Sequence, residues 1–419
     1  MTRTVSIVAG LLAAAVSLAA PQESAAQSNV NITLKYGVLA GLTGDPAPSG
    51  QGWNEAARLG VEYAIDTLKS MNLPNVKIVL ADSQDSQGSP APGVEAAQKL
   101  VNIDRVNVII GDFYSSVTSA AATAVAIPNQ VLMFTGGTSP ALTKLNTGTT
   151  TLLWQPVAAD DLQGRVLAMV IGDALGKKAK INVAARNDAY GTNLSNVFKE
   201  AWLAGGGTIP EMVVYNHQQP TLDSEAQRIA QGNPDGWLFI DFCQTFEKLA
   251  LPLIRTGKWD SAKSFGSDTL NDCQSRGSKN YPGMRATQAN ASSGTSFPAF
   301  KALFERKAKP GVKFQSFIAE SFDSVFIALL AALQAKSSDP IKISQQVVAV
   351  TNDPGEAFTF EQLDQAIKAA LAGKKIHFHG ATGPINFAAN GRITATNYDI
   401  WQHKADGSAA VVKTIAFQP

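Results

Sequence analysis

Cysteine and charge are both scarce in this sequence of 419 residues. Its two cysteines exclude a disulfide-dense scaffold and a four-cysteine zinc site. Charged residues make up 16% of the chain, with 35 Lys+Arg against 34 Asp+Glu. A nucleic-acid-binding protein needs a basic surface to neutralise phosphates, and a polybasic membrane-surface protein needs an excess of Lys and Arg. The formal net charge of +1 argues against both classes.

Long hydrophobic runs are also missing from the chain after its N-terminal segment. No stretch there has the roughly 18 consecutive apolar residues of a membrane-spanning helix. The N-terminal run from Val5 to Ala20 is shorter than the ~20 residues needed to cross a bilayer. Arg3 precedes it, and the small residues Ser24 and Ala26 follow it. This pattern predicts a signal peptide over residues 1–26, cleaved after Ala26. An uncleaved membrane anchor is the alternative. We expect a mature protein exported to an oxidising compartment, the periplasm.

Hydrophobic residues, in contrast, make up 45% of the chain, and their spacing alternates between strand and helix periods. Strands separated by helices are typical of right-handed parallel βαβ units. The series repeats once, which predicts an α/β fold with two doubly wound parallel-sheet lobes. The predicted strands are 32–39, 76–81, 106–110, 131–134, 181–185, 212–215, 237–241 and 264–266. The predicted helices are 54–71, 92–102, 116–127, 162–176, 191–204, 224–230 and 245–257.

The C-terminal third is predicted to return to the first lobe. Residues 283–296 are rich in Gly, Ser and Ala and are interpreted as a crossing between the lobes. Helices are expected over 298–307, 319–335 and 360–372. Residues 383–417 alternate as β-structure does, with turns at Asn390-Gly391 and Asp406-Gly407. The polar segment 272–296 has no specific explanation beyond a rim of the second lobe.

Polar turns follow several of the predicted strands, where ligands of open α/β sheets bind. Ser115 leaves one strand and opens a helix, which suits a carboxylate or phosphate, although a capping hydroxyl alone is the alternative. Gly136 and Gly137 end the next strand and permit close backbone approach to a ligand. Similar turns follow the strands of the second lobe, at 186–191, 241–242 and 267–268. Together they predict a binding cleft between the lobes.

These turns carry a family resemblance that covers nearly the whole mature length. The chain resembles the type I periplasmic solute-binding proteins of the branched-chain amino acid ABC transporter class, such as leucine/isoleucine/valine-binding proteins. The resemblance implies three crossings that form a multi-strand hinge, with lobe one at 30–157 plus 292–388 and lobe two at 158–291 plus 389–419. The matching motifs are 37–44 (GVLAGLTG), 82–85 (DSQD), 110–111 (IG), 114–116 (YSS), 135–143 (TGGTSPALT), 188–191 (DAYG) and 383–391 (GPINFAANG).

The resemblance also implies a function and a set of site residues. It implies capture of a small carboxylate-bearing solute by hinge closure, and delivery to the permease subunits of an ABC importer in the inner membrane. The protein is expected to be a monomer that binds no nucleic acid. The matching positions are Ser115 and Thr138 for the ligand's carboxylate, Ser116 for a further amide donor, Gly136 and Asp268 for its ammonium, and Tyr190 and Phe242 for the wall from lobe two.

Some positions depart from the family pattern. Ser49 stands where the family has a Tyr that covers the side-chain pocket. An aromatic pocket is predicted from Trp53, Phe113, Tyr114 and Phe242, although these residues are equally typical of ordinary core. Such a pocket favours an aromatic or large aliphatic carboxylate. Asp268 favours an amino acid, because a buried carboxylate without a partner is costly; a surface turn is its alternative.

The two cysteines follow neighbouring strand ends, at Cys243 and Cys273. In a parallel sheet these loops lie within disulfide reach, so we expect a bond that stabilises the protein by ~3 kcal/mol. Two free buried thiols are the alternative. The family's better-known bridge lies in lobe one, so this pair is not inherited from it.

No cofactor, metal or catalytic machinery is expected. His377 and His379 share one strand face without a visible third metal ligand. Motifs of serine hydrolases, phosphate loops and zinc proteases are missing, and Ser115 has no evident histidine partner. The protein is therefore expected not to be an enzyme. A periplasmic receptor that signals to a membrane partner is the main alternative, and an exported amidohydrolase is the third.

Overall fold

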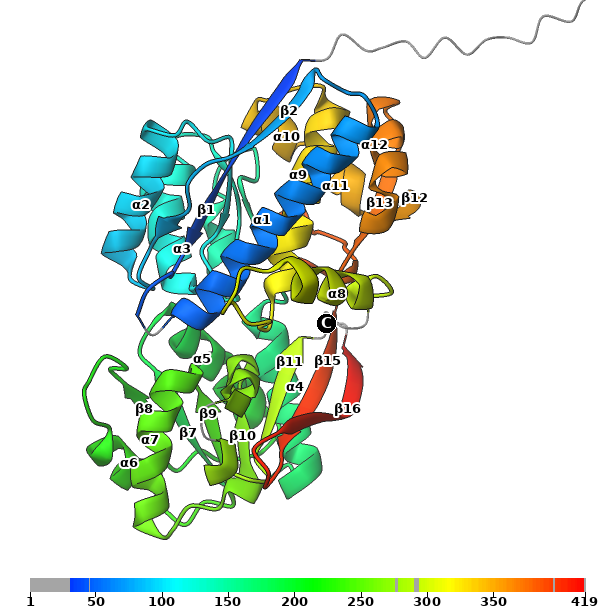
Figure 1. The fold of residues 1–419 in the computed structure, drawn as a ribbon. Helices are drawn as coiled ribbons and strands as arrows, with labels where there is room; N and C mark the ends of the chain where they lie inside the picture. Colours follow the sequence, from blue (N-terminus) through cyan, green and yellow to red (C-terminus); the bar gives the residue numbers. More distant parts are fainter. Residues whose placement is uncertain (1–30, 45, 276–277, 290–293, 395, 418–419) are drawn as a thin grey trace, which may run out of the picture.

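The structure consists of two α/β lobes, one above the other in Figure 1. It is a computed structural model that describes residues 31–44, 46–275, 278–289, 294–394 and 396–417. The predicted signal peptide lies outside the described residues. The two lobes are built on separate sheets, which confirms the predicted fold class.

The first lobe contains a six-stranded parallel sheet in the order β2-β1-β4-β5-β6, with β3 paired to the end of β1. Helices pack on both of its faces, as the alternating pattern predicts (Figure 1). The strands are β1 (Ile32–Ala40), β2 (Val76–Leu80), β3 (Gln84–Asp85), β4 (Val108–Gly111), β5 (Leu132–Phe134) and β6 (Leu153–Trp154). The helices are α1 (Ala47–Ser70), α2 (Pro90–Asn102) and α3 (Ser115–Ala121).

The second lobe contains a seven-stranded sheet in the order β16-β15-β11-β10-β9-β7-β8. Its pairs are parallel from β8 to β11 and antiparallel from β11 to β16. The strands are β7 (Ile181–Arg186), β8 (Met212–Tyr215), β9 (Gly236–Ile240), β10 (Ser264–Gly266), β11 (Arg285–Ala289), β15 (Thr396–His403) and β16 (Ala409–Phe417). The helices are α4 (Asp160–Leu175), α5 (Ala189–Ala204), α6 (Asp223–Ile229) and α7 (Cys243–Thr256).

One helix of the C-terminal third, α9 (Ile318–Ala335), lies in the core of lobe one. By length and composition it is the one helix in the described part of the chain that would pass for a membrane span, yet 89% of it is buried inside the protein. It packs against α1 and against the inner strands β1 and β4 of the first sheet. The surrounding elements are α8 (Phe297–Lys307), α10 (Pro340–Ser344), α11 (Val347–Thr351), α12 (Leu363–Leu371), and a small sheet of β12 (Glu356–Thr359), β13 (Ile376–Gly380) and β14 (Gly383–Pro384).

The segment predicted as a crossing, 283–296, is a strand over much of its length. β11 (Arg285–Ala289) pairs in parallel with β10 and antiparallel with β15. The strands on both sides pair with its backbone N–H and C=O groups. Small and polar residues therefore suffice to form this central strand. Residues 290–293 of the predicted crossing lie outside the described part of the chain.

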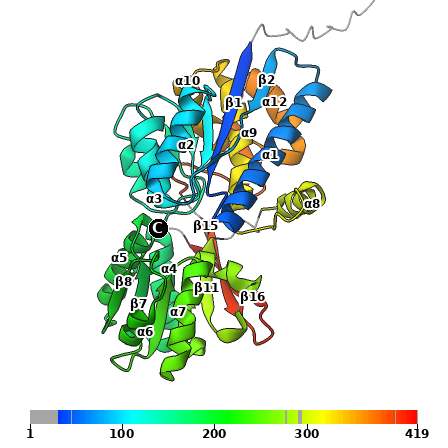
Figure 2. The same ribbon diagram turned by 60° about the vertical axis from the view of Figure 1, so that its left-hand side comes forward.

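The first and third crossings lie side by side. The Gln155 amide donates to the Gly391 carbonyl at 2.7 Å, and the Arg392 guanidinium pairs with Asp161 at 2.9 Å. In the view of Figure 2, the ends of α1 and α3 point toward the second lobe, with α3 beside α5. The carboxyl ends of both sheets therefore face each other across the hinge.

Candidate functional site

A small cavity lies where the two lobes meet. It receives Phe113, Ser115, Gly136, Thr138 and Phe317 from lobe one, and Tyr190, Phe242, Asp268 and Thr269 from lobe two. Six of the nine predicted ligand residues are in this lining. The cavity volume open to the centre of a water molecule is about 10 Å³. This is roughly enough for one water. The lobes are therefore closed on each other in this structure.

Hydroxyl groups form the lobe-one wall. Ser115 is the first residue of α3, directly after β4, and Thr138 follows β5. The Ser115 Oγ accepts the Ser139 amide at 3.2 Å, which leaves its own proton free to donate. Gly136 lies between them, and a Cβ there would come within 2.8 Å of the Trp53 ring. Two hydroxyls beside a close-approaching backbone suit a ligand carboxylate.

Buried hydrogen bonds hold this wall in place. The Asp112 carboxylate accepts the Tyr114 amide at 2.7 Å and the Ser86 hydroxyl. The Asp112 carbonyl accepts the hydroxyls of Thr118 and Thr135 at 3.0 and 2.8 Å. Burial raises the pKa of Asp112 to about 7, and these bonds to the carboxylate oppose that rise. The turns after β4 and β5 are thereby joined into one unit that fixes Ser115 and Gly136.

A carboxylate dominates the lobe-two wall. Tyr190 donates its hydroxyl to Asp268 Oδ1 at 2.6 Å, and the Thr269 amide donates to the same oxygen at 2.8 Å. Asp268 is 3% exposed. Burial raises its pKa to about 6, although the Tyr190 bond opposes the rise. An acidic group held this way is a partner for a ligand ammonium.

Phe242 carries the aromatic contact between the lobes. Its ring centroid lies 4.5 Å from that of Tyr114 across the cleft and 5.3 Å from that of Tyr190. The Arg186 guanidinium stacks over it at 4.3 Å. Arg186 is itself buried and paired with Asp188 and Asp241. Phe242 is thus supported from within lobe two while it closes the cavity toward lobe one.

Asp160 is the group that sequence reasoning missed. It begins α4 at the first crossing, and its amide donates to the Thr138 carbonyl at 2.9 Å. It is fully buried, and neither carboxyl oxygen has a hydrogen-bond partner of good geometry among the described residues. Burial first, and then the charge of Asp268, raise its pKa well above the usual range. Acidic residues are common in the first turn of a helix. The position of Asp160 in the sequence therefore did not mark it as a site residue.

The remaining predicted residues lie behind the lining. Trp53 is fully buried and packs edge-on against Phe113 at 6.1 Å. Tyr114 contacts Phe242 rather than the cavity. Ser116 is half-buried on α3 and is not in the lining. Direct ligand contacts by these three residues stay predictions. Phe317, which does line the cavity, directly precedes α9 and follows a loop that gave no sequence signal.

A disulfide joins Cys243 to Cys273, with the Cα atoms 5.2 Å apart. It ties the start of α7, directly after Phe242, to the 3-10 helical segment Asp268–Ser275. The bond therefore holds together the two loops of lobe two that carry Phe242 and Asp268.

Comparisons with known proteins agree with this architecture. A family model described as "Periplasmic binding protein" matches residues 33–408. The Leu/Ile/Val-binding protein BraC3 of Rhizobium johnstonii is 32% identical over 183 residues, which is 43% of this chain and 46% of that protein. BasB of Halobacterium salinarum, a chemotactic signal transduction system substrate-binding protein, is 20% identical over 75% of this chain and 74% of its own length.

Solved structures share the fold at low identity. The leucine-binding protein LivK of Thermotoga maritima superposes with a TM-score of 0.73 at 19% identity, covering 91% of this chain and 98% of that one. A solute-binding protein of R. palustris in complex with 4-hydroxybenzoate gives a TM-score of 0.70 at 17% identity, covering 92% and 98%. The predicted resemblance is confirmed: the chain belongs to the periplasmic binding protein family, in the type I class that includes the branched-chain amino acid-binding proteins.

Proposed function

We propose that this protein is the extracytoplasmic solute-binding component of an ABC importer, and that its solute is a small zwitterion of the amino acid class. The observation that carries the proposal is the pairing of opposite chemistries in one cavity. Hydroxyl donors line the cavity from lobe one, at Ser115 and Thr138, and a buried carboxyl group lines it from lobe two, at Asp268. A second buried carboxyl group, Asp160, is outside the lining and is joined to it by its amide, which donates to the Thr138 carbonyl.

The charge balance of the cavity favours an ammonium group. The charge of Asp268 adds to the rise in the pKa of Asp160, because two buried negative charges repel. A ligand ammonium placed near them would reverse this effect and allow both to ionise. A ligand without an ammonium group would leave the carboxyls to be neutralised by protons. The 4-hydroxybenzoate in the R. palustris protein is of that second kind, and we do not expect such a ligand here.

Closure of the two lobes completes the site in this account. We take lobe one as 30–157 plus 292–388 and lobe two as 158–291 plus 389–419, joined by three crossings. The ligand's carboxylate binds lobe one first. Hinge rotation then brings Tyr190, Phe242 and Asp268 against it. Closure buries the ligand and forms the surface that the permease subunits recognise. Members of the family are extracytoplasmic, and a signal peptide over residues 1–26 would export this one to the periplasm.

A thermal-shift screen of residues 27–419 tests the proposal. The protein is first unfolded and refolded to remove carried-over ligand. A ligand at 100 times its Kd adds about 2.7 kcal/mol to the free energy of unfolding, which raises the Tm by a few degrees for a chain of this size. We expect stabilisation by amino acids. Stabilisation by benzoates and short fatty acids alone would contradict the proposal.

A second candidate function rests on the similarity to BasB, a chemotactic substrate-binding protein. In that case the closed form would bind a membrane receptor instead of a permease. Deletion of the gene separates the two roles. Loss of uptake of the radiolabelled ligand indicates transport, whereas loss of chemotaxis with uptake unchanged indicates sensing.

A further inference from the structure

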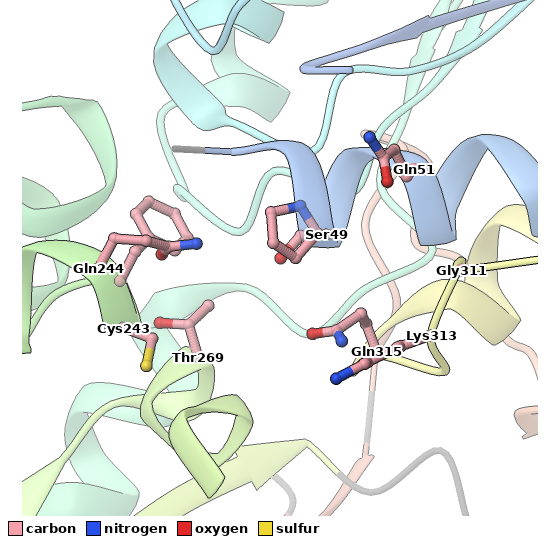
Figure 3. A pocket seen from close by; sticks show the side chains of 10 residues that line it. Ser49, Gln51, Cys243, Gln244, Thr269, Gly311, Lys313 and Gln315 are labelled. Carbon is pink, nitrogen blue, oxygen red and sulfur yellow. The ribbon is translucent and has the colours of Figure 1, made fainter. Parts of the chain in front are cut away.

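A second, larger pocket lies next to the inner cavity, and Figure 3 shows the side chains that line it. The volume open to the centre of a water molecule is about 180 Å³ in this pocket and about 10 Å³ in the inner cavity. Because Phe242 and Thr269 line both spaces, the two are neighbours. The remaining wall comes from the start of α1, the start of α7 and the loop before α9: Pro48, Ser49, Gln51, Cys243, Gln244, Gly311, Lys313 and Gln315.

The lining of this outer pocket is polar and carries one charge. Lys313 is the one ionisable side chain among the described residues that line it, since Cys243 is in a disulfide. In Figure 3 the Lys313 and Gln315 side chains extend from the loop toward Thr269 and the start of α1, and Gln244 extends toward Ser49 from the opposite side. Ammonium and amide N–H groups that converge from two lobes suit a carboxylate oxygen.

The size of the inner cavity adds an independent argument. In this closed arrangement it has room for about one water, because Phe113, Phe242 and Phe317 fill its sides, and it leaves no space for a long ligand side chain. The larger space that shares Phe242 with it is the outer pocket, where Ser49 is a small residue of the wall at the start of α1.

We propose that the outer pocket is a second subsite for an anionic group, and that the ligand is an elongated acidic amino acid. Its amino acid head binds in the inner cavity and its distal carboxylate binds beside Lys313, with hydrogen bonds from Gln315 and Gln244. This inference rests on the proposed function and adds the identity of the side chain.

Titration calorimetry on the refolded protein tests the subsite with four probes: L-glutamate, L-2-aminoadipate, the uncharged L-glutamine, and L-leucine. We expect the wild type to bind an acidic probe most tightly. Lys313→Gln should weaken that probe by tenfold or more, because the variant loses the charge-assisted hydrogen bond to the distal carboxylate. Binding of L-leucine should change less than about twofold, within the small effect of an exposed charge.

Two further variants serve as controls. Lys309→Gln removes the same charge from an exposed position outside the pocket and should leave all four affinities unchanged. Ser49→Tyr should narrow the outer pocket and exclude the acidic probes while short amino acids still bind.

The outcomes separate the two proposals. If amino acids bind but Lys313→Gln weakens acidic and neutral probes equally, or not at all, the subsite is overturned and the proposed function stands. Preference of the wild type for L-leucine over both acidic probes also overturns the subsite. If no amino acid binds the wild type, the proposed function fails and the subsite fails with it.

Discussion

Two buried carboxyl groups lie at the inner cavity: Asp268 lines it, and Asp160 is hydrogen-bonded through its amide to Thr138 of the lining. Burial raises the pKa of Asp268 from 3.8 to about 6, and it raises the pKa of Asp160 further, helped by the charge of Asp268. Tyr190 and the Thr269 amide hold one oxygen of Asp268 by hydrogen bonds, so this group is the one more ready to ionise. At neutral pH the cavity therefore presents the ionised carboxylate of Asp268. Its hydrogen bonds offset only part of the cost of burying that charge.

This arrangement predicts that binding depends on pH. The affinity for an amino acid should fall as the pH is lowered from about 7 to about 5, because protonation of Asp268 removes the partner of the ammonium. Asp268→Asn should weaken binding at pH 7 and abolish most of the pH dependence. Calorimetry at several pH values measures both effects. An affinity that is equal at pH 5 and pH 7 in the wild type would contradict the role of Asp268.

The stability of the ligand-free protein should change in the opposite sense. Between the unfolded pKa of 3.8 and the folded pKa of about 6, the folded protein binds a proton that the unfolded chain does not. The Asp268 contribution to the free energy of unfolding therefore falls as the pH rises through this window. Denaturant titrations of the wild type and Asp268→Asn should show a smaller fall in the variant. An equal fall in both proteins would show that Asp268 is not the group responsible.

The hydroxyls of lobe one give a further prediction. Ser115→Ala combined with Thr138→Ala should weaken carboxylate-bearing ligands by several kcal/mol, since each charge-assisted bond contributes about 1.5–3 kcal/mol. Ser116→Ala, next to Ser115 on α3 but outside the cavity lining, is the matched control and should bind normally. Calorimetry measures the difference after circular dichroism has checked the fold. Unchanged affinity in the double variant would remove these hydroxyls from the site.

At the scale of elements, hydrophobic periodicity predicted most of the βαβ units, and buried strands such as β4 and β9 were placed within one or two residues. β11 was not predicted as a strand, because its fit depends on neighbours far along the chain rather than on its own residues. The short strand β12 was missed for the same reason, whereas His377 and His379 were expected on a strand and lie in β13. The predicted start of α1 was late, since Pro48 is tolerated in the first turn of a helix.

The site was predictable where a polar residue directly follows a buried strand. Ser115 after β4 and Asp268 after β10 are of this kind, and both line the cavity. Phe317 reaches the cavity from a loop, and Asp160 is joined to its lining by the hydrogen bond to Thr138. Sequence alone does not show where those segments lie in space.

The disulfide is the element-scale feature with the clearest effect on stability. Replacing both Cys243 and Cys273 by Ser releases a loop of 30 residues and should lower the free energy of unfolding by about 3–4 kcal/mol in the chain-entropy account. Denaturant titration measures this change. Because the bond also joins the loops of Phe242 and Asp268, the affinity for ligand should fall as well. A variant as stable as the wild type would show that packing alone holds these loops.

At the scale of the whole molecule, the two lobes enclose the cavity, and their contact depends on few residues. Phe242 bridges to Tyr114 across the cleft, and the Arg392–Asp161 ion pair joins the first and third crossings. The aromatic contact can be lost when the lobes open, whereas the crossings stay connected. Binding by closure requires both features: a contact between the lobes that can separate, and a hinge that stays intact.

The central claim is that the closed lobes hold a zwitterion, with its carboxylate on lobe one and its ammonium near Asp160 and Asp268. Titration calorimetry with matched compounds tests it most directly: the amino acid that gives the largest thermal shift, its analogue without the amino group, and its analogue without the carboxyl group. The account predicts that the amino acid binds at least about a hundredfold more tightly than either analogue, a difference of roughly 2.7 kcal/mol. Equal binding of the analogue that lacks the amino group would contradict the account.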